Sequence, residues 1–344
     1  MLEPAPNSVA DDDGRPRFGT FSGALGRVDL SQLRGQFQVA RPLRRLKRKR
    51  WLYWFAATHE VAVLSAAVDV GYTANAFALA VDLKSGEVLH DSTVLGVPQL
   101  VSVSDEANEG LAVRYVDPRL MFRATRTAGA PRFELSVRAG LPLLGKRIDA
   151  DVELLAAGAP APLTVVAPVT GGIVNVTQKW AGLLSFGTLV ANGRKYLLDG
   201  GVGGMDYTHG YLARRTAWRW AFGCGRLADG SPVGLNLVEG FNDAQAGVNE
   251  NALWLHGRLV PLSRARFSWN ESDPLDAWRV VTDDGEVDLQ FRPRALHREE
   301  RNVVVAKSHF VQPVGLFDGK ISLGTEEHLV TDLPGVTEEQ DVTW

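Results

Sequence analysis

Two residues near the centre of the chain carry side chains that could exchange protons. Asp206 and His209 follow the glycine-rich stretch GGVGG, where the sequence predicts a loop that leads into a strand. A carboxyl group and an imidazole at the mouth of a cavity could act as acid and base. Alternatively, both side chains bond only to the backbone of their own loop. The spacing leaves both interpretations open.

Glu239 is the second candidate acid. On a strand, side chains two positions apart share a face, so Glu239 falls beside Leu235 and Leu237. A carboxylate among apolar side chains either pairs with a cation or has a raised pKa, because desolvation disfavours its charged form. The alternative is a strand-end glutamate that stands in water next to Gly240.

An aromatic wall is predicted beside these acids. With Thr216–Arg226 as a strand, the period of two places Trp218, Trp220, Phe222 and Cys224 on one face. A neutral carboxylic acid in an apolar pocket can protonate an alkene, and aromatic faces stabilise a carbocation. Three polar residues complete this predicted site as a framework: Arg215, Glu250 and Asn251.

The elements that would position these residues are strands. Runs rich in β-branched and aromatic residues alternate with turn dipeptides such as Asn192-Gly193 and Asp229-Gly230, and no long amphipathic helix is evident. We expect a mainly β protein of two consecutive antiparallel β-barrel-like domains with little helix. The predicted division is a disordered leader over 1–17, a first domain over 18–160 and a second over 161–344 with a solvated acidic tail.

Composition narrows the class of protein. The chain has 344 residues, a formal net charge of −3 and a single cysteine, Cys224. These values give no reason to expect nucleic-acid binding and exclude disulfides within the chain and Cys-based zinc clusters. No nucleotide-binding glycine motif or metal-binding histidine pair occurs, so we expect neither cofactor nor metal. Without a signal peptide or an apolar span, the expected location is the cytoplasm.

A basic run, Arg41–Arg50, precedes the first aromatic strand. Its cations could make a weak contact with anionic lipid headgroups, which would make the protein peripheral to a membrane. The alternative is a solvated strand entry whose charges are matched by the acidic leader and tail.

Several of these segments resemble the domain-of-unknown-function family 2804. The matching stretches are KRKRWLYW at Lys47–Trp54, Gln178 with Lys179, and the block D-x-x-x-G-x-x-x-x-R-T-x-W-x-W-A that begins at Asp206. A G-x-N-L segment at Gly234 and an E-N-A-L segment at Glu250 follow. The resemblance adds Lys179 and Asn236 to the predicted ligand-binding residues.

More distantly, the chain is similar to two-domain lipocalin-like (calycin) proteins of the carotenoid 1,2-hydratase and tocopherol-cyclase type. That resemblance implies a cavity that accepts an isoprenoid or another lipid-like molecule. Three functions therefore remain open. The first is cofactor-free acid catalysis such as hydration, cyclisation or isomerisation, and the second is a lipid or pigment carrier in which Asp206 pairs with Arg215. The third is a purely structural β protein.

Overall fold

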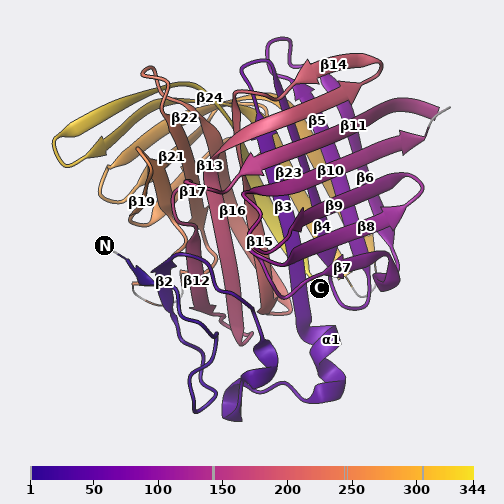
Figure 1. Cartoon of the computed structure of the whole chain (residues 1–344), viewed down its shortest axis with the longest axis vertical. Coiled ribbons are helices and arrows are strands. Elements are labelled where there is room, and N and C mark those ends of the chain that lie inside the picture. The colour runs from indigo at the N-terminus through magenta and orange to yellow at the C-terminus, as the bar shows by residue number, and fades with distance from the viewer. Residues whose placement is uncertain (1, 142–143, 244, 246, 304–305) are drawn as a thin grey trace.

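The structure is a computed structural model that describes residues 2–141, 144–243, 245, 247–303 and 306–344. Strands dominate it, and the helices are single short turns before or between strands (Figure 1). These helices are η1 (Leu30–Gln32), η2 (Gly35–Phe37), η3 (Arg41–Leu43), α1 (Arg44–Lys47) and η4 (Pro98–Leu100). Within the described residues, no helix has the length and apolar character needed to cross a membrane.

The first sheet has 15 strands among the described residues, and its main path runs β6-β5-β4-β3-β15-β13-β11-β10-β9-β8-β7. Its strands are β1 (Glu3–Pro4), β2 (Gly19–Ser22), β3 (Arg48–Ala57), β4 (Val61–Asp69), β5 (Ala74–Asp82), β6 (Val88–Gly96), β7 (Val101–Val103), β8 (Leu111–Asp117), β9 (Leu120–Arg126), β10 (Arg132–Leu141), β11 (Leu144–Leu155), β12 (Leu163–Pro168), β13 (Val174–Ala191), β14 (Arg194–Leu197) and β15 (Gly201–Tyr211).

The second sheet has nine strands in the part of the chain that the structure describes, in the order β19-β18-β17-β16-β24-β23-β22-β21-β20. They are β16 (Arg215–Arg226), β17 (Pro232–Glu239), β18 (Ala252–Leu255), β19 (Arg258–Pro261), β20 (Ala265–Ser268), β21 (Trp278–Thr282), β22 (Val287–Val303), β23 (Ala306–Leu323) and β24 (Glu326–Thr343). The expected mainly β fold of two barrel-like units with little helix is confirmed. The chain passes between the sheets at Tyr211–Arg215, and residue 160 lies between β11 and β12 of the first sheet.

Two segments that the composition predicted to be solvated belong to the fold. The leader was expected to be disordered, but β1 pairs in parallel with β2, and Val9 and Ala10 are buried in the first core. The acidic tail forms most of β24, which pairs with β16 on one side and β23 on the other. In the leader the adjacent Val9 and Ala10 are buried, and in the tail buried apolar residues such as Val336 and Val342 lie on the same strand as the acids.

The apolar side chains form three cores, because both faces of several strands are buried. On β3, Leu52 and Trp54 point into the core enclosed by the first sheet, while Tyr53 and Phe55 point toward the second sheet. The far face of the second sheet holds a third core that includes Leu235 and Leu237 of β17. The core between the sheets is the layer in which the two halves of the chain meet.

Aromatic pairs and a glycine set the distance between the two sheets. Tyr53 meets Trp220 edge-on with ring centroids 5.0 Å apart, and Phe55 meets Phe222 at 6.1 Å. At Gly204 on β15, a Cβ atom would lie 2.0 Å from the carbonyl oxygen of Trp180 and 2.7 Å from Phe222. A larger residue there would push β15 away from both neighbours, so the sheets are closely packed at this end.

Candidate active site

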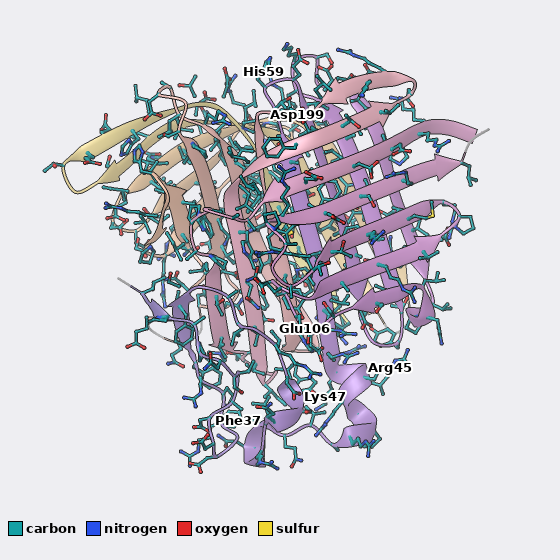
Figure 2. The ribbon with its side chains drawn as sticks, viewed as in Figure 1. Phe37, Arg45, Lys47, His59, Glu106 and Asp199 are labelled. Atoms are coloured by element: carbon teal, nitrogen blue, oxygen red, sulfur yellow. The ribbon has the colours of Figure 1, made fainter. Side chains whose placement is uncertain are left out.

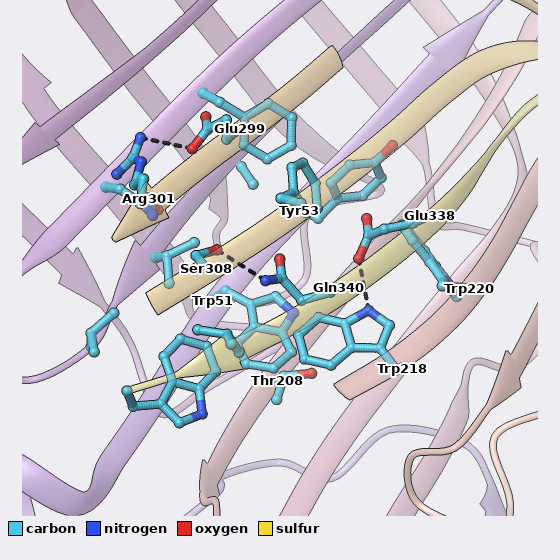
Figure 3. Close-up of a pocket in the computed structure, with 18 of the residues that line it drawn as sticks. Trp51, Tyr53, Thr208, Trp218, Trp220, Glu299, Arg301, Ser308, Glu338 and Gln340 are labelled. Atoms are coloured by element: carbon cyan, nitrogen blue, oxygen red, sulfur yellow. Dashed lines mark hydrogen bonds and ion pairs between the residues drawn. The ribbon is translucent and has the colours of Figure 1, made fainter. Parts of the chain in front are cut away.

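A cavity of about 720 Å³ lies between the two sheets. Its walls come from β3, β4, β5, β6, β13 and β15 of the first sheet and from β16, β17, β22, β23 and β24 of the second. Figure 3 shows part of these walls. The lining is largely apolar and aromatic, and a small set of polar groups projects into it. The cavity therefore occupies the space between the sheets, whose own interiors are filled by the first and third cores.

Glu338 of β24 is an acid that faces this cavity from the second sheet. It is 5% exposed, and it accepts a hydrogen bond from Trp218 Nε1 at 2.7 Å (Figure 3). A second bond comes from Gln312 Nε2 at 2.5 Å. Burial raises its pKa to about 7, even though both hydrogen bonds favour the ionised form. Near neutral pH a large share of Glu338 is thus a carboxylic acid that can donate a proton.

Tyr53 lies beside Glu338 and carries a hydroxyl group that could donate a hydrogen bond to a ligand. Its hydroxyl is buried and has no hydrogen-bond partner within the described residues. Burial, with the nearby Glu338 carboxylate, raises the pKa of this phenol well above its usual value, so it stays protonated. A buried hydroxyl without a partner is costly, which makes it a position where a ligand oxygen would be favoured.

Lys179 anchors a second acidic group on the cavity wall. Its ammonium lies 2.8 Å from Asp206 Oδ2 and 3.0 Å from Glu250 Oε2, and all three side chains are buried. Burial alone would lower the pKa of Lys179, but the two carboxylates outweigh it and raise that pKa. Burial raises the pKa of Glu250, and the neighbouring charge of Asp206 adds to this effect.

Hydrogen bonds fix both carboxylates of this cluster. Asp206 accepts bonds from Thr177, Thr208 and Trp51, at 3.1, 3.3 and 3.3 Å. Glu250 Oε1 accepts from Asn242 Nδ2 at 2.9 Å. Together with the Lys179 ammonium, these bonds hold the Asp206 carboxyl group in one position in the wall.

A third polar group lies on β22. Glu299 faces the cavity and pairs with Arg301 at 2.7 Å (Figure 3), and His297 Nε2 lies 3.3 Å from it. His297 Nδ1 lies 2.7 Å from Asp91, and the ring stacks on Phe77 at 5.1 Å. Burial alone would lower the pKa of His297, but its bonds to Asp91 and Glu299 raise it to about 9.

One end of the cavity is open. In the first sheet the end of β4, the start of β5 and the end of β6 lie together, because Asp69 pairs with Ala74 and Ala74 with Gly96. In the second sheet the start of β23 and the end of β24 lie together, because Lys307 pairs with Thr343. Residues at both places line the cavity, so these strand ends form one edge of it. Four lining residues at this edge are exposed to solvent: Tyr72, Leu95, Asn302 and Lys307. We call this edge the mouth.

The structure brings five of the predicted site residues to the cavity wall: Lys179, Asp206, Trp218, Trp220 and Glu250. Three others support them from behind. Asn236 accepts from Trp220 Nε1 at 2.8 Å, and Phe222 packs against Tyr53 and Phe55. Asn251 accepts from the backbone N–H of Val238, which lines the cavity.

Three predicted residues lie outside the cavity. Glu239 is on the opposite face of β17, where it pairs with Arg219 at 3.3 Å and accepts from the backbone of Phe267. Arg215 is exposed and pairs with Asp341, so the expected pair with Asp206 does not form.

His209 is the third of them, because Asp206–His209 is part of strand β15 and not of a loop. An odd separation on a strand places two side chains on opposite faces. His209 is buried on the face away from Asp206, and burial lowers its pKa well below the usual value. It is therefore a neutral interior residue.

Sequence reasoning missed Glu338, Glu299 and Tyr53. The signal for Glu338 was present, since Val336, Glu338, Gln340 and Val342 alternate with more polar residues along one strand. Tyr53 lies in the matched segment WLYW, where the period of two separates it from Leu52 and Trp54. Glu299 has no comparable signal, because its neighbours HREER are all polar or charged.

No group of His, Cys, Asp and Glu side chains that could hold a metal ion is found among the described residues. The chemistry that the cavity offers by itself is proton transfer from Glu338 beside aromatic faces. Trp51 and Trp218 stack with centroids 6.0 Å apart, and Lys179 lies 5.6 Å from the centroid of the Trp220 ring.

Solved structures with a similar fold span nearly the whole chain. An AttH protein of Nitrosomonas europaea has 14% identity and a TM-score of 0.52, over 86% of this chain and 92% of its own. CghA with Sch210972 has 14% identity and a TM-score of 0.51, over 98% and 97%. Kievitone hydratase of Nectria haematococca has 11% identity and a TM-score of 0.51, over 99% and 98%. At these identities the likeness concerns the fold alone.

No curated protein matches the sequence. The model of the family described as "Domain of unknown function (DUF2804)" matches residues 3–344. The chain therefore belongs to this family, as the resemblance in its motifs predicted.

Proposed function

We propose that this member of the family binds an apolar small molecule that carries one polar group, and transforms it by proton transfer without a cofactor. The observation that carries the proposal is Glu338, a buried carboxyl group with a pKa raised to about 7 on the wall of an apolar cavity. The unpartnered Tyr53 hydroxyl beside it would hold the polar group of the ligand. A kievitone hydratase and CghA with a bound small molecule share this fold, which supports the proposal by analogy.

The reaction class follows from a neutral acid beside aromatic faces. Glu338 gives its proton to one carbon of a carbon–carbon double bond, and the π electron pair forms the new C–H bond. The cation left on the other carbon would lie beside the aromatic side chains of the cavity wall, where contact with an aromatic face contributes about 0.5–2 kcal/mol. Addition of water, attack by a group of the same molecule, or loss of a proton would then give hydration, cyclisation or isomerisation. The last step returns a proton to the Glu338 carboxylate.

Deuterium labelling tests the proposal even while the substrate is unidentified. The protein is incubated in D₂O with a lipid extract or an isoprenoid panel, and the products are analysed by mass spectrometry. All three reactions place one solvent-derived, non-exchangeable deuterium on carbon, so the wild type is expected to give labelled species. Glu338→Gln is expected to abolish the label because an amide cannot donate this proton.

The control is Glu239→Gln, which removes a carboxylate outside the cavity. Equal labelling by wild type and Glu338→Gln would rule out Glu338 as the acid. A copurifying apolar ligand that is never labelled would instead identify the protein as a carrier, the alternative that fits the same cavity.

A further inference from the structure

The segment Arg41–Lys47 lies at the lower end of the molecule, which it shares with the segment around Phe37 (Figures 1 and 2). It consists of η3 and α1, and Figure 2 shows Arg45 and Lys47 at this lower end. We call this segment the tip. Every one of its residues is exposed except Arg44, which is half-buried.

The cations of the tip are not neutralised by the rest of the protein. Within the described residues, Arg41, Arg44, Arg45 and Lys47 make no ion pair, whereas Arg48 and Arg50 both pair with Asp69. Two carboxylates of the acidic segments that were expected to match them are engaged elsewhere. Asp11 bonds to the backbone of its own loop, and Asp341 of β24 pairs with Arg215. The tip therefore presents a local positive charge on a protein whose net charge is −3.

Apolar side chains gather at the same end. Eleven large apolar side chains are exposed among the described residues, and five of them belong to the tip or to the strand ends around the mouth. They are Leu43 (45%), Leu46 (51%), Tyr72 (37%), Leu95 (51%) and Val97 (58%). Exposed leucines alternating with cations are typical of segments that lie in the headgroup region of a membrane.

The tip is attached directly to the mouth. Lys49 Nζ donates to the carbonyl oxygens of Leu46 at 2.7 Å and Val70 at 2.9 Å, which ties the tip to the turn after β4. Arg45 Nε donates to the carbonyl of Gly71 at 3.1 Å. The same ammonium of Lys49 faces the rings of Tyr72 and Trp344, which both line the cavity. A surface that binds the tip would therefore also face the mouth.

We infer that the tip docks the protein on an anionic lipid bilayer, with Leu43 and Leu46 in the headgroup region and the mouth turned toward the lipid. The charge of the tip is complementary to anionic headgroups, and its exposed leucines distinguish this surface from one built for nucleic acid. An apolar ligand could then pass between bilayer and cavity without crossing water. Docking itself stands independently of the proposed function, whereas this route for the ligand rests on it.

Vesicle cosedimentation tests the docking. Vesicles of phosphatidylcholine alone are compared with vesicles that also contain phosphatidylserine, at low and at raised salt. We expect binding only with phosphatidylserine, weakened by salt. The double variant Arg41→Gln/Lys47→Gln should lower the affinity about 25-fold, since each cation near an anionic surface contributes about fivefold. Leu43→Ser/Leu46→Ser should weaken binding even at low salt.

Matched controls remove the same groups elsewhere on the surface. Lys195→Gln/Arg258→Gln deletes two exposed cations on β14 and β19, and Leu197→Ser/Leu329→Ser deletes two exposed leucines. Both controls should bind vesicles as the wild type does. Absence of vesicle binding at low salt, or an equal loss in the controls, would overturn the inference.

A duplex DNA probe tests whether the tip binds nucleic acid instead. If the wild type binds DNA but not vesicles, and the tip variants lose DNA binding, the tip is assigned to nucleic acid. Because docking needs neither Glu338 nor the cavity, Glu338→Gln should bind vesicles normally. A failed labelling experiment and a failed docking experiment are thus distinguishable.

Discussion

Replacement of Glu338 by glutamine should change how the stability of the protein depends on pH. In the folded protein its pKa is raised from an ordinary value of 4.5 to about 7. The folded state therefore binds this proton more tightly than the unfolded state does. The stabilisation is present in full below about pH 4.5 and is lost as the pH rises through about 7, because both states are ionised above that value.

The size of the effect follows from the shift. A change of about 2.5 pKa units corresponds to roughly 3 kcal/mol, at about 1.4 kcal/mol per unit. Glutamine keeps the shape of the side chain, and its carbonyl can accept from Trp218 as Glu338 does. Gln312 can rotate its amide by half a turn to accept from the new NH₂, since its own Oε1 has no partner within the described part of the chain. Glu338→Gln should therefore fold and lack the pH-dependent loss.

The assay is urea unfolding of both proteins at pH 4.5 and pH 7.5, in which the free energy of unfolding is compared between the two proteins at each pH. Other titrating groups are common to both and cancel in this comparison. From pH 4.5 to pH 7.5, the free energy of unfolding of the wild type should fall by about 3 kcal/mol more than that of Glu338→Gln. Glu327→Gln, which removes an exposed carboxylate from the same strand, should behave as the wild type. A difference below about 0.5 kcal/mol would refute the assignment of Glu338 as a neutral acid.

Three further predictions concern stability. Lys179→Met should lower the free energy of unfolding by about 3–5 kcal/mol, measured by urea titration, because it leaves Asp206 and Glu250 buried without a cation. As a control, Lys84→Met removes the cation of an exposed ion pair and should lower the free energy of unfolding by about 0–1 kcal/mol. His297 has a pKa raised to about 9, so its protonation stabilises the folded protein in full below about pH 6.5, and this stabilisation of about 3 kcal/mol is lost as the pH rises through 9. In His297→Gln the free energy of unfolding should no longer fall over this pH range. If the variant and the wild type have the same dependence of unfolding on pH, the assignment of His297 is contradicted. Gly204→Ala should lower the thermal midpoint through an overpacking cost of about 1–3 kcal/mol, while Gly26→Ala, with open space around its Cβ position, should leave it nearly unchanged.

The fold class could be predicted from the sequence because alternation and turn dipeptides are local properties. The same reasoning placed Trp218, Trp220 and Phe222 together on one face of a strand, and in the structure that face meets the first sheet. It failed at Glu239 because both faces of β17 are buried against apolar layers. Alternation then shows which side chains share a face, but it cannot show which of the two faces meets the cavity.

The two other failures have different physical origins. Asp206 and His209 were assigned to a loop because glycines precede them, but those glycines allow close packing between strands, and β15 continues through both residues. Glu338 was taken for part of a solvated tail because six acids lie in the last twenty residues. Pairing of β24 with β16 and β23 depends on partners far away in the sequence, which composition does not reveal.

The position of β24 also determines when the cavity can exist during synthesis. The wall of the cavity that contains Tyr53 belongs to the first sheet and is made early. β24, which carries Glu338, leaves the ribosome after both strands with which it pairs. At about 5–20 residues per second, the 285 positions between these residues take roughly 15–60 s. During that interval β16 and the other strands of the second sheet are made, but the cavity still lacks the wall that carries Glu338. Newly made protein should therefore bind chaperones that recognise apolar surface until its last strand is inserted.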